Sequence, residues 1–232
     1  MVTLLTEQNH DLRAKLICVF DSEGIPGSVI TAAPTLKALV ITFKGTAAHA
    51  GIEPERGRSA ITAAARAVAA MEVGRIDEET TVNVGLIEGG SAVNVVPERC
   101  VVHAEVRSHD QAKLARLVTA MVDAATLAAA ETGVDVDVDV HEHFRGYAWA
   151  PESLPLRMVD AAFADAGLDA RHIRSGGGSD SNAFNTRGLA AVTLGVGFER
   201  VHSPLESIRV ERLGQLYDIA HALVRAASRT VA

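Results

Sequence analysis

The sequence predicts an α/β protein in which a ferredoxin-like domain, a four-stranded antiparallel sheet with two helices, interrupts an incomplete α/β layer. Residues 36–145 follow the order strand–helix–strand–strand–helix–strand, which is the ferredoxin-like order. The residues on either side alternate apolar strands with helices, as open α/β sheets do. We therefore expect one domain made of residues 1–35 and 147–232 and a second domain, inserted at 36–146.

The first elements are predicted from apolar runs. A short polar helix is expected at 4–15, before a continuous apolar run at 16–20 that is typical of a strand buried on both faces. Asp21 follows this strand directly, and open α/β sheets place their chemistry at the carboxyl ends of strands. A second short strand is expected at 27–32.

Changes of hydrophobic period define the inserted domain. Apolar residues alternate up to Leu86, the chain reverses at Gly89, and the next strand puts Arg107 on the opposite face from Val106. Valine and aspartate alternate over 134–140, which predicts an antiparallel strand with one wet face near a sheet edge. The expected elements are a strand at 36–43, a helix at 59–71 that Gly74 stops, a hairpin at 81–107, a helix at 110–132 capped by Asp110 and Gly133, and the strand at 134–140.

The C-terminal part returns to alternating helices and strands. Helix formers, glycine stops and apolar runs mark its elements. They are a helix at 155–166 stopped by Gly167, a glycine-rich loop at 175–185 that opens a short helix, a buried strand at 189–194, a loop at 195–205 and a final helix at 211–227.

Composition excludes several classes of function. The 232 residues are 48% hydrophobic with a net charge of −7, and no basic stripe with interleaved aromatics is present, which argues against nucleic-acid binding. The sequence has neither a signal-peptide pattern nor an apolar run of the roughly 20 residues that a membrane span needs. We therefore expect a cytoplasmic protein whose Cys18 and Cys100 are reduced and buried, with a disulfide or a metal role as the alternatives.

Four motifs occur in order along the chain. They are HAGIEPERGRSAI, which contains His49; EGGSAVNVVPERC, which contains Asn94; the strand that ends in Arg107; and GGGSDSNAFNTRG followed by VHSPLE. Together they resemble motifs of the zinc exopeptidase and amidohydrolase family that includes peptidase T, acetylornithine deacetylase and carboxypeptidase G. The resemblance covers nearly the whole chain and is strongest to the peptidase T branch.

The resemblance implies a fold, a reaction and partners. Members of this family have a catalytic α/β domain with an inserted ferredoxin-like lid that dimerises. Two zinc ions share a water molecule, a glutamate takes its proton, and the bond that is hydrolysed is an amide at the end of a peptide or an acylated amino acid. We therefore expect a metallopeptidase, such as an aminopeptidase, with zinc as cofactor, a peptide or N-acylated amino acid as substrate, and a homodimer formed through the lid.

The resemblance also assigns residues within the inserted domain. His49 is similar to a lid histidine that stabilises the oxyanion in the partner subunit's site, and Asn94 and Arg107 are similar to residues that hold the oxyanion or substrate and the substrate carboxylate. All three then belong to one substrate-holding side of the site. The structural alternatives are a loop histidine that caps a backbone group, an Asx turn at Asn94, and a solvated arginine at a strand end.

The outer segments carry the other assignments. Gly177 and Gly178 resemble a loop that lines the substrate pocket, with a plain glycine turn as the alternative. Asp21 and His202 are similar to two zinc ligands, with a turn aspartate and a surface histidine as the alternatives.

The chain departs from the family pattern before Asp21. The family's histidine–x–aspartate motif, bridging aspartate and glutamate pair precede that position, and the twenty residues here match none of them. The pair Glu78 and Glu79 is expected to be solvated, and His141 with His143 is not expected to bind metal.

Two residues do not complete a dinuclear zinc site, so full zinc occupancy is not expected. We expect the C-terminal portion of a family member that is inactive alone, either a truncated product or one half of a split enzyme whose N-terminal half is a separate chain. The alternative is a non-catalytic dimerisation module derived from this family.

Overall fold

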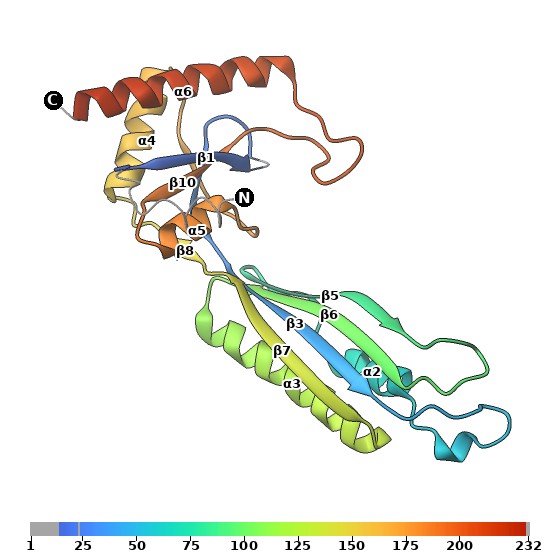
Figure 1. Cartoon of the computed structure of the whole chain (residues 1–232). Helices are drawn as coiled ribbons and strands as arrows, with labels where there is room; N and C mark the ends of the chain where they lie inside the picture. The colour runs from blue at the N-terminus through green and yellow to red at the C-terminus, as the bar shows by residue number, and fades with distance from the viewer. Residues whose placement is uncertain (1–13, 23, 231–232) are drawn as a thin grey trace. The chain divides into compact units, whose positions relative to one another are not determined.

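The computed structural model describes residues 14–22 and 24–230, which form two compact units (Figure 1). Unit 1 comprises residues 1–34 with 145–232, and unit 2 comprises residues 35–144. The helix expected at 4–15 falls almost entirely outside the described residues. No described helix is both long enough and apolar enough to cross a bilayer.

Unit 2 is an antiparallel sheet with two helices packed on it. Its strands lie in the order β4-β5-β6-β3-β7, and the four long strands have the ferredoxin-like arrangement (Figure 1). The elements are β3 (Thr35–Lys44), η1 (Pro54–Arg56), α2 (Ala60–Ala70), β4 (Gly74–Asp77), β5 (Thr80–Gly89), β6 (Arg99–Ser108), α3 (Gln111–Thr132) and β7 (Asp135–Phe144).

The core of unit 2 lies between the sheet and its helices. Leu39 and Phe43 of β3 are fully buried, as are the alanines on the inner face of α2, which allow that helix to approach the sheet closely. Asp110 caps α3 by accepting the backbone N–H groups of Ala112 and Lys113 at 2.7 and 3.1 Å. Gly133 ends α3 in the left-handed conformation, with φ 66°.

The strand of alternating valine and aspartate is β7, at one edge of the sheet as expected. Its valines at 136 and 138 pack against the core, whereas its aspartates are exposed. Lys44 of β3 forms an ion pair with Asp137. Charges on an edge strand discourage pairing with another strand.

Unit 1 is a small mixed sheet with helices. β1 is parallel to β10, which is antiparallel to β2, and β2 also pairs with β8 and β9. Helices α4 and α6 pack with the sheet around a core that includes Val29, Leu156, Phe163, Leu194 and Ile219. The elements are β1 (Ile17–Ser22), β2 (Ser28–Ala33), β8 (Tyr147–Ala148), α4 (Leu154–Asp165), β9 (Arg171–Arg174), α5 (Asp180–Thr186), β10 (Ala191–Gly195) and α6 (Val210–Thr230).

The structure differs from the sequence-based expectations at β1, at β5 and at Gly74. The run at 16–20 is only half buried, because β1 lies at the edge of its sheet and pairs with β10 alone among the described strands. The alternation in β5 breaks at a register shift between Val84 and Leu86, which leaves Leu86 56% exposed. Gly74 does not end α2, which stops at Ala70; it begins β4 instead.

Candidate functional site

Two loops of unit 2 meet at the end of the sheet where β3 ends and β6 begins (Figure 1). His49 and Val95 form an isolated antiparallel bridge. Around it, Ala50 donates its N–H to the Asn94 carbonyl, and Val96 donates to the Ala48 carbonyl, each at 2.9 Å. We call the joined segments 45–59 and 90–98 the paired loops. They bring the backbones of the exposed residues His49 and Asn94 close together.

The imidazole of His49 is oriented by its own loop. The Gly51 N–H donates to its Nδ1 at 3.2 Å, so Nδ1 acts as an acceptor. In the neutral ring the proton then resides on Nε2. The backbone contact that the sequence offered as a structural alternative is therefore present, and it leaves Nε2 as the donor.

Close packing holds the paired loops in shape. A Cβ atom on Gly45 would lie 1.9 Å from the Arg58 carbonyl oxygen, and one on Gly57 would lie 2.7 Å from Val96. Thr46 and Arg58 exchange backbone hydrogen bonds at 3.0 and 2.9 Å. These contacts preorganise the loops before any ligand arrives.

Arg107 lies at the opposite end of β6. It pairs with Leu36 and Thr81, whereas the paired loops leave from the Arg99 end. At about 3.3 Å per residue, the eight positions from Arg99 to Arg107 span roughly 26 Å. Within one copy of unit 2, the structure therefore joins His49 with Asn94 and separates both from Arg107.

In unit 1, the parallel strands β1 and β10 end at the same edge of the sheet. Ser22 is in register with Gly195, and the Val196 N–H donates to the Ser22 carbonyl at 2.9 Å. Asp21 is exposed at this edge, and the loop that carries His202 starts beside it. Two residues far apart in sequence thus belong to neighbouring segments.

The His202 loop has an unusual backbone. Arg200 and His202 have φ values of 56° and 61°, the left-handed region that non-glycine residues rarely adopt. The Glu206 carboxylate accepts the His202 N–H at 2.8 Å, and the Ser203 hydroxyl donates to the Arg200 carbonyl at 2.7 Å. Such strain concentrates at functional sites, and the His202 side chain is exposed.

The glycine-rich loop is anchored at its end by hydroxyl groups. Ser179 contacts Thr193 of β10 at 2.5 Å, and Thr193 donates to Ser181 at 2.7 Å. A Cβ atom on Gly176 would meet nothing within 4 Å, and one on Gly177 would meet only the Ser175 hydroxyl, at 3.7 Å. Packing around Gly176 and Gly177 therefore does not require glycine, and the Gly177 N–H donates to the Ser175 hydroxyl at 3.0 Å, so the plain glycine turn remains as an alternative to a pocket-lining loop.

Across the described residues, no group of three or more His, Cys, Asp or Glu side chains is arranged to hold a metal ion. Burial raises the pKa of the Cys18 thiol to about 12, and Cys100 is fully buried, so neither sulfur is a ready thiolate. Both cysteines are free thiols, but only Cys100 is fully buried; Cys18, expected to be buried, is half-buried in the edge strand β1.

Two polar clusters of unit 2 were not expected. Glu79, predicted to be solvated, lies 2.9 Å from the Lys113 ammonium, which also contacts Asp77 at 2.8 Å. Glu105 forms a two-pronged ion pair with Arg107 at 2.9 and 3.2 Å. The i, i+2 spacing on a strand was the sequence signal for this second pair.

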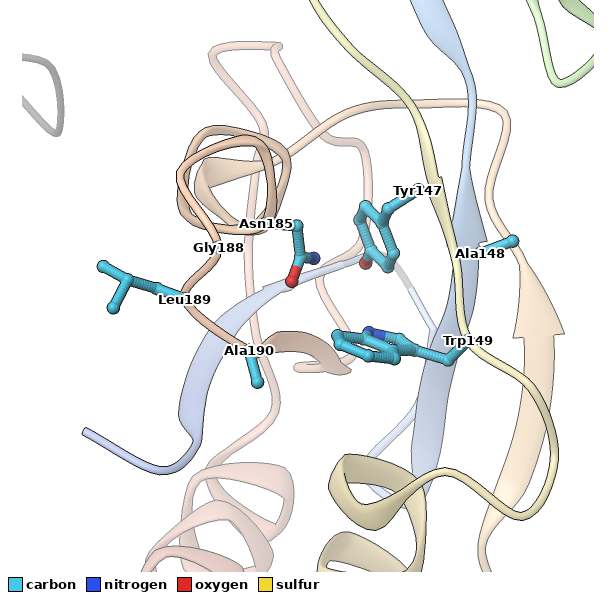
Figure 2. Close-up of a pocket in the computed structure, with 7 residues that line it drawn as sticks. All are labelled: Tyr147, Ala148, Trp149, Asn185, Gly188, Leu189 and Ala190. Carbon is cyan, nitrogen blue, oxygen red and sulfur yellow. The ribbon is translucent and has the colours of Figure 1, made fainter. Parts of the chain in front are cut away.

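A pocket of about 350 Å³ in unit 1 lies beside the start of β10, away from the edge that carries Asp21. Figure 2 shows the rings of Tyr147 and Trp149 and the amide of Asn185 around it. The Trp149 indole and the Asn185 amide bond the Ala191 backbone at 2.9–3.1 Å, so they hold the start of the strand. Sequence reasoning did not find this pocket, and it contains none of the expected site residues.

Comparison with known proteins matches residues 31–133 to the peptidase dimerisation domain of the M20 type. An uncharacterised protein of Bacillus subtilis, YqjE, is 36% identical over 209 residues, which are 90% of this chain and 56% of that protein. The structure of the aminopeptidase PepT from Bacillus cereus has a TM-score of 0.82 and 36% identity, covering 97% of this chain and 61% of that one. A Staphylococcus aureus tripeptidase structure has a TM-score of 0.86 and 33% identity, covering 94% and 58%. The chain thus spans a little over half the length of these relatives.

Proposed function

The chain carries the peptidase dimerisation domain of the M20 family at residues 31–133 and has the fold of PepT-like peptidases, and on that premise we propose that it holds substrate in a dimeric hydrolase. Its reaction is cleavage of a terminal peptide or amide bond. The observation that carries this proposal is the set of paired loops, which hold a histidine N–H donor beside an asparagine on a rigid tip.

A tetrahedral oxyanion is stabilised best by donors that are fixed before the reaction. Backbone hydrogen bonds join the loops that carry two such donors, the Nε2–H of His49 and the side-chain amide of Asn94, and the Gly51 N–H orients the His49 ring. Their exposure allows insertion into a site on another polypeptide. We assign both residues to the oxyanion.

Arg107 is assigned to the free carboxylate of the substrate. A guanidinium binds a carboxylate with two parallel hydrogen bonds. Because roughly 26 Å of strand separates Arg107 from the tip of the same domain, the two serve one substrate only if the tip comes from the partner copy. This supports a homodimer in which His49 and Asn94 act in trans.

The free edge of β5 supports the same assembly. β4 covers β5 only at Thr80–Val82, and beyond that point Leu86 and Ile87 are 56% and 53% exposed. Ile61 on α2 is 39% exposed. An uncovered strand edge with apolar side chains is suited to pairing with the same edge of a second copy.

We propose zinc binding only on the condition that another polypeptide supplies further ligands. Asp21 and His202 are two candidate ligands, whereas a catalytic zinc site takes three from protein and a dinuclear site takes more. The donor set offered by the described residues therefore does not fit the complete group, and no catalytic step is assigned to it. Among the described strands β1 pairs with β10 alone, and this edge supports a complementing polypeptide that adds a strand there.

A second candidate function is a non-catalytic dimerisation module. The specific observation in its favour is that the described residues provide no cluster of metal ligands. It predicts a stable dimer that neither binds zinc nor recognises a peptide carboxylate.

Titration of the purified chain with a tripeptide, combined with elemental analysis for zinc, separates the two functions. The hydrolase proposal predicts binding that weakens about tenfold in Arg107→Ala and is unchanged in Arg99→Ala, at the other end of the same strand. It also predicts no turnover by this chain alone. Rapid hydrolysis that is lost in His202→Ala would contradict the assignment of missing ligands, and absence of peptide binding would favour the module.

A further inference from the structure

The guanidinium of Arg107 is held by a second residue of its own strand. The Arg107 Nε–H donates to Glu105 Oε1 at 2.9 Å, and its Nη2 donates to Oε2 at 3.2 Å. Both side chains stand on the half-exposed face of β6, two positions apart, with exposures of 30% and 34%. Because β6 is bonded to β5 on one side and β3 on the other, both attachment points are fixed.

Glu105 occupies one edge of the Arg107 guanidinium and leaves a second edge open to another carboxylate. Arginine has five N–H donors in a rigid planar fork, and Glu105 takes two of them along the Nε–Nη2 edge. The edge formed by Nη1 and the remaining Nη2 proton can still receive a second carboxylate with two parallel hydrogen bonds. A guanidinium held in this way points its open edge in one direction.

The surroundings make Glu105 specific to this arginine. Its cross-strand neighbours are Ala38 and Asn83, and those of Arg107 are Leu36 and Thr81, all uncharged. A solvent-accessible ion pair contributes little to stability, so stability alone is a weak reason for this pair.

We propose that Glu105 is a positioning residue, which fixes the Arg107 guanidinium so that its open edge receives the terminal carboxylate of the substrate. This inference rests on the proposed function, because it takes Arg107 as the carboxylate-binding group. Without Glu105, Arg107 samples its other rotamers, and the free energy of binding then includes the entropy cost of ordering this side chain. Ordering one long side chain weakens binding by about three- to tenfold.

The charge of Glu105 and its effect on the orientation of Arg107 change the affinity for a carboxylate in opposite directions. Glu105 also repels an incoming carboxylate, so its removal at low salt relieves a repulsion while it releases the arginine. At 0.5 M salt the Debye length is about 4 Å, which screens most of that repulsion. Binding at high salt therefore reports orientation.

The test titrates the full chain with triglycine and with its C-terminal amide at 0.5 M salt. Glu105→Ala is expected to bind triglycine about three- to tenfold more weakly, Glu105→Gln, which keeps one acceptor, to bind with intermediate affinity, and the amide to bind equally in all variants. The matched control is Glu131→Ala, which breaks the exposed Arg66–Glu131 pair at 3.5 Å, away from Arg107 and outside the paired loops, and is expected to leave triglycine binding unchanged.

An independent readout is the Nε–Hε resonance of Arg107 in a ¹H–¹⁵N spectrum, assigned by its loss in Arg107→Lys. It is expected to be sharp at neutral pH in the native chain and to broaden by solvent exchange in Glu105→Ala. Triglycine binding that weakens in Arg107→Lys but not in Glu105→Ala would overturn the positioning role alone. If neither Arg107→Lys nor Glu105→Ala changes triglycine binding, the assignment of Arg107 to the substrate carboxylate is overturned, and the positioning role of Glu105 is overturned with it.

Discussion

The backbone N–H of Ala50 donates to the backbone carbonyl of Asn94 across 2.9 Å, so two loops more than forty residues apart move as one body. Together with the bond from the Val96 N–H to the Ala48 carbonyl, this contact forms the bridge of His49 with Val95, which holds together the two loops that carry the proposed oxyanion donors. The loops owe their shape to close packing and to one ring hydrogen bond, and each can be altered separately.

The first prediction concerns the tautomer of His49. Because the Gly51 N–H donates to Nδ1, the neutral ring should carry its proton on Nε2. A ¹⁵N spectrum of the imidazole should show a pyrrole-type Nε2 and a pyridine-type Nδ1. Gly51→Pro removes the donor and should give a mixture of tautomers, whereas Gly51→Ala keeps the N–H and should leave the spectrum unchanged. A predominant Nδ1–H tautomer in the native chain would rule out the proposed donor.

The second prediction concerns packing of the paired loops. Gly57 has a β-type backbone, φ −81°, so alanine there is not strained, but its Cβ would lie 2.7–2.8 Å from the Val96 side chain. Gly57→Ala should lower the free energy of unfolding by about 1–3 kcal/mol in urea denaturation. Gly176→Ala, which meets nothing within 4 Å, should not. The double substitution with Val96→Ala should recover part of the loss; if it does not, the clash is not the cause.

The third prediction concerns association through β5. Leu86→Glu places a charge on the exposed edge, and the proposed dimer should then become a monomer in analytical ultracentrifugation. Leu127 on α3 is 62% exposed but lies away from that edge, so Leu127→Glu should remain a dimer. The opposite pattern would move the interface to the helical face.

The fourth prediction concerns acid stability of unit 2. The Lys113 ammonium is the main cause that lowers the pKa of Asp77 to about 2. A carboxyl whose pKa is lower in the folded state stabilises the fold above its unfolded pKa, about 3.9, and loses that contribution as pH falls toward 2. Lys113→Met should therefore flatten the decline in stability between pH 4 and 2, measured by thermal unfolding. Asp77→Asn should flatten it equally, and a decline that persists in both variants would assign it to other carboxyls.

Much of the architecture was predicted from the hydrophobic period of each segment and from the capping and glycine residues at its ends. The alternation of β7, the caps of α3 at Asp110 and Gly133, and the strand–helix order of unit 2 are local properties that a sequence displays directly. The strands β4, β8 and β9 were missed because they are two to four residues long and take their structure from neighbours rather than from their own pattern.

Less of the candidate site could be predicted from the sequence. Motifs named His49, Asn94 and Arg107, but only the register of β6 shows that Arg107 belongs to the other end of the sheet. The half-buried state of β1 had the same origin, because an apolar run does not reveal whether its strand is central or at an edge. Strain at Arg200 and His202 also has no signature in residue type.

The aspartates of β7 have a consequence for the size of any assembly built by unit 2. Among the described strands, one edge of the sheet is charged, and on the other side β5 is open beyond the segment that β4 covers, so copies would add at a single side only. Two open edges can close on each other around a two-fold axis, after which both outer edges are charged strands. Growth therefore stops at two copies, where a sheet with both edges open would continue into a ribbon.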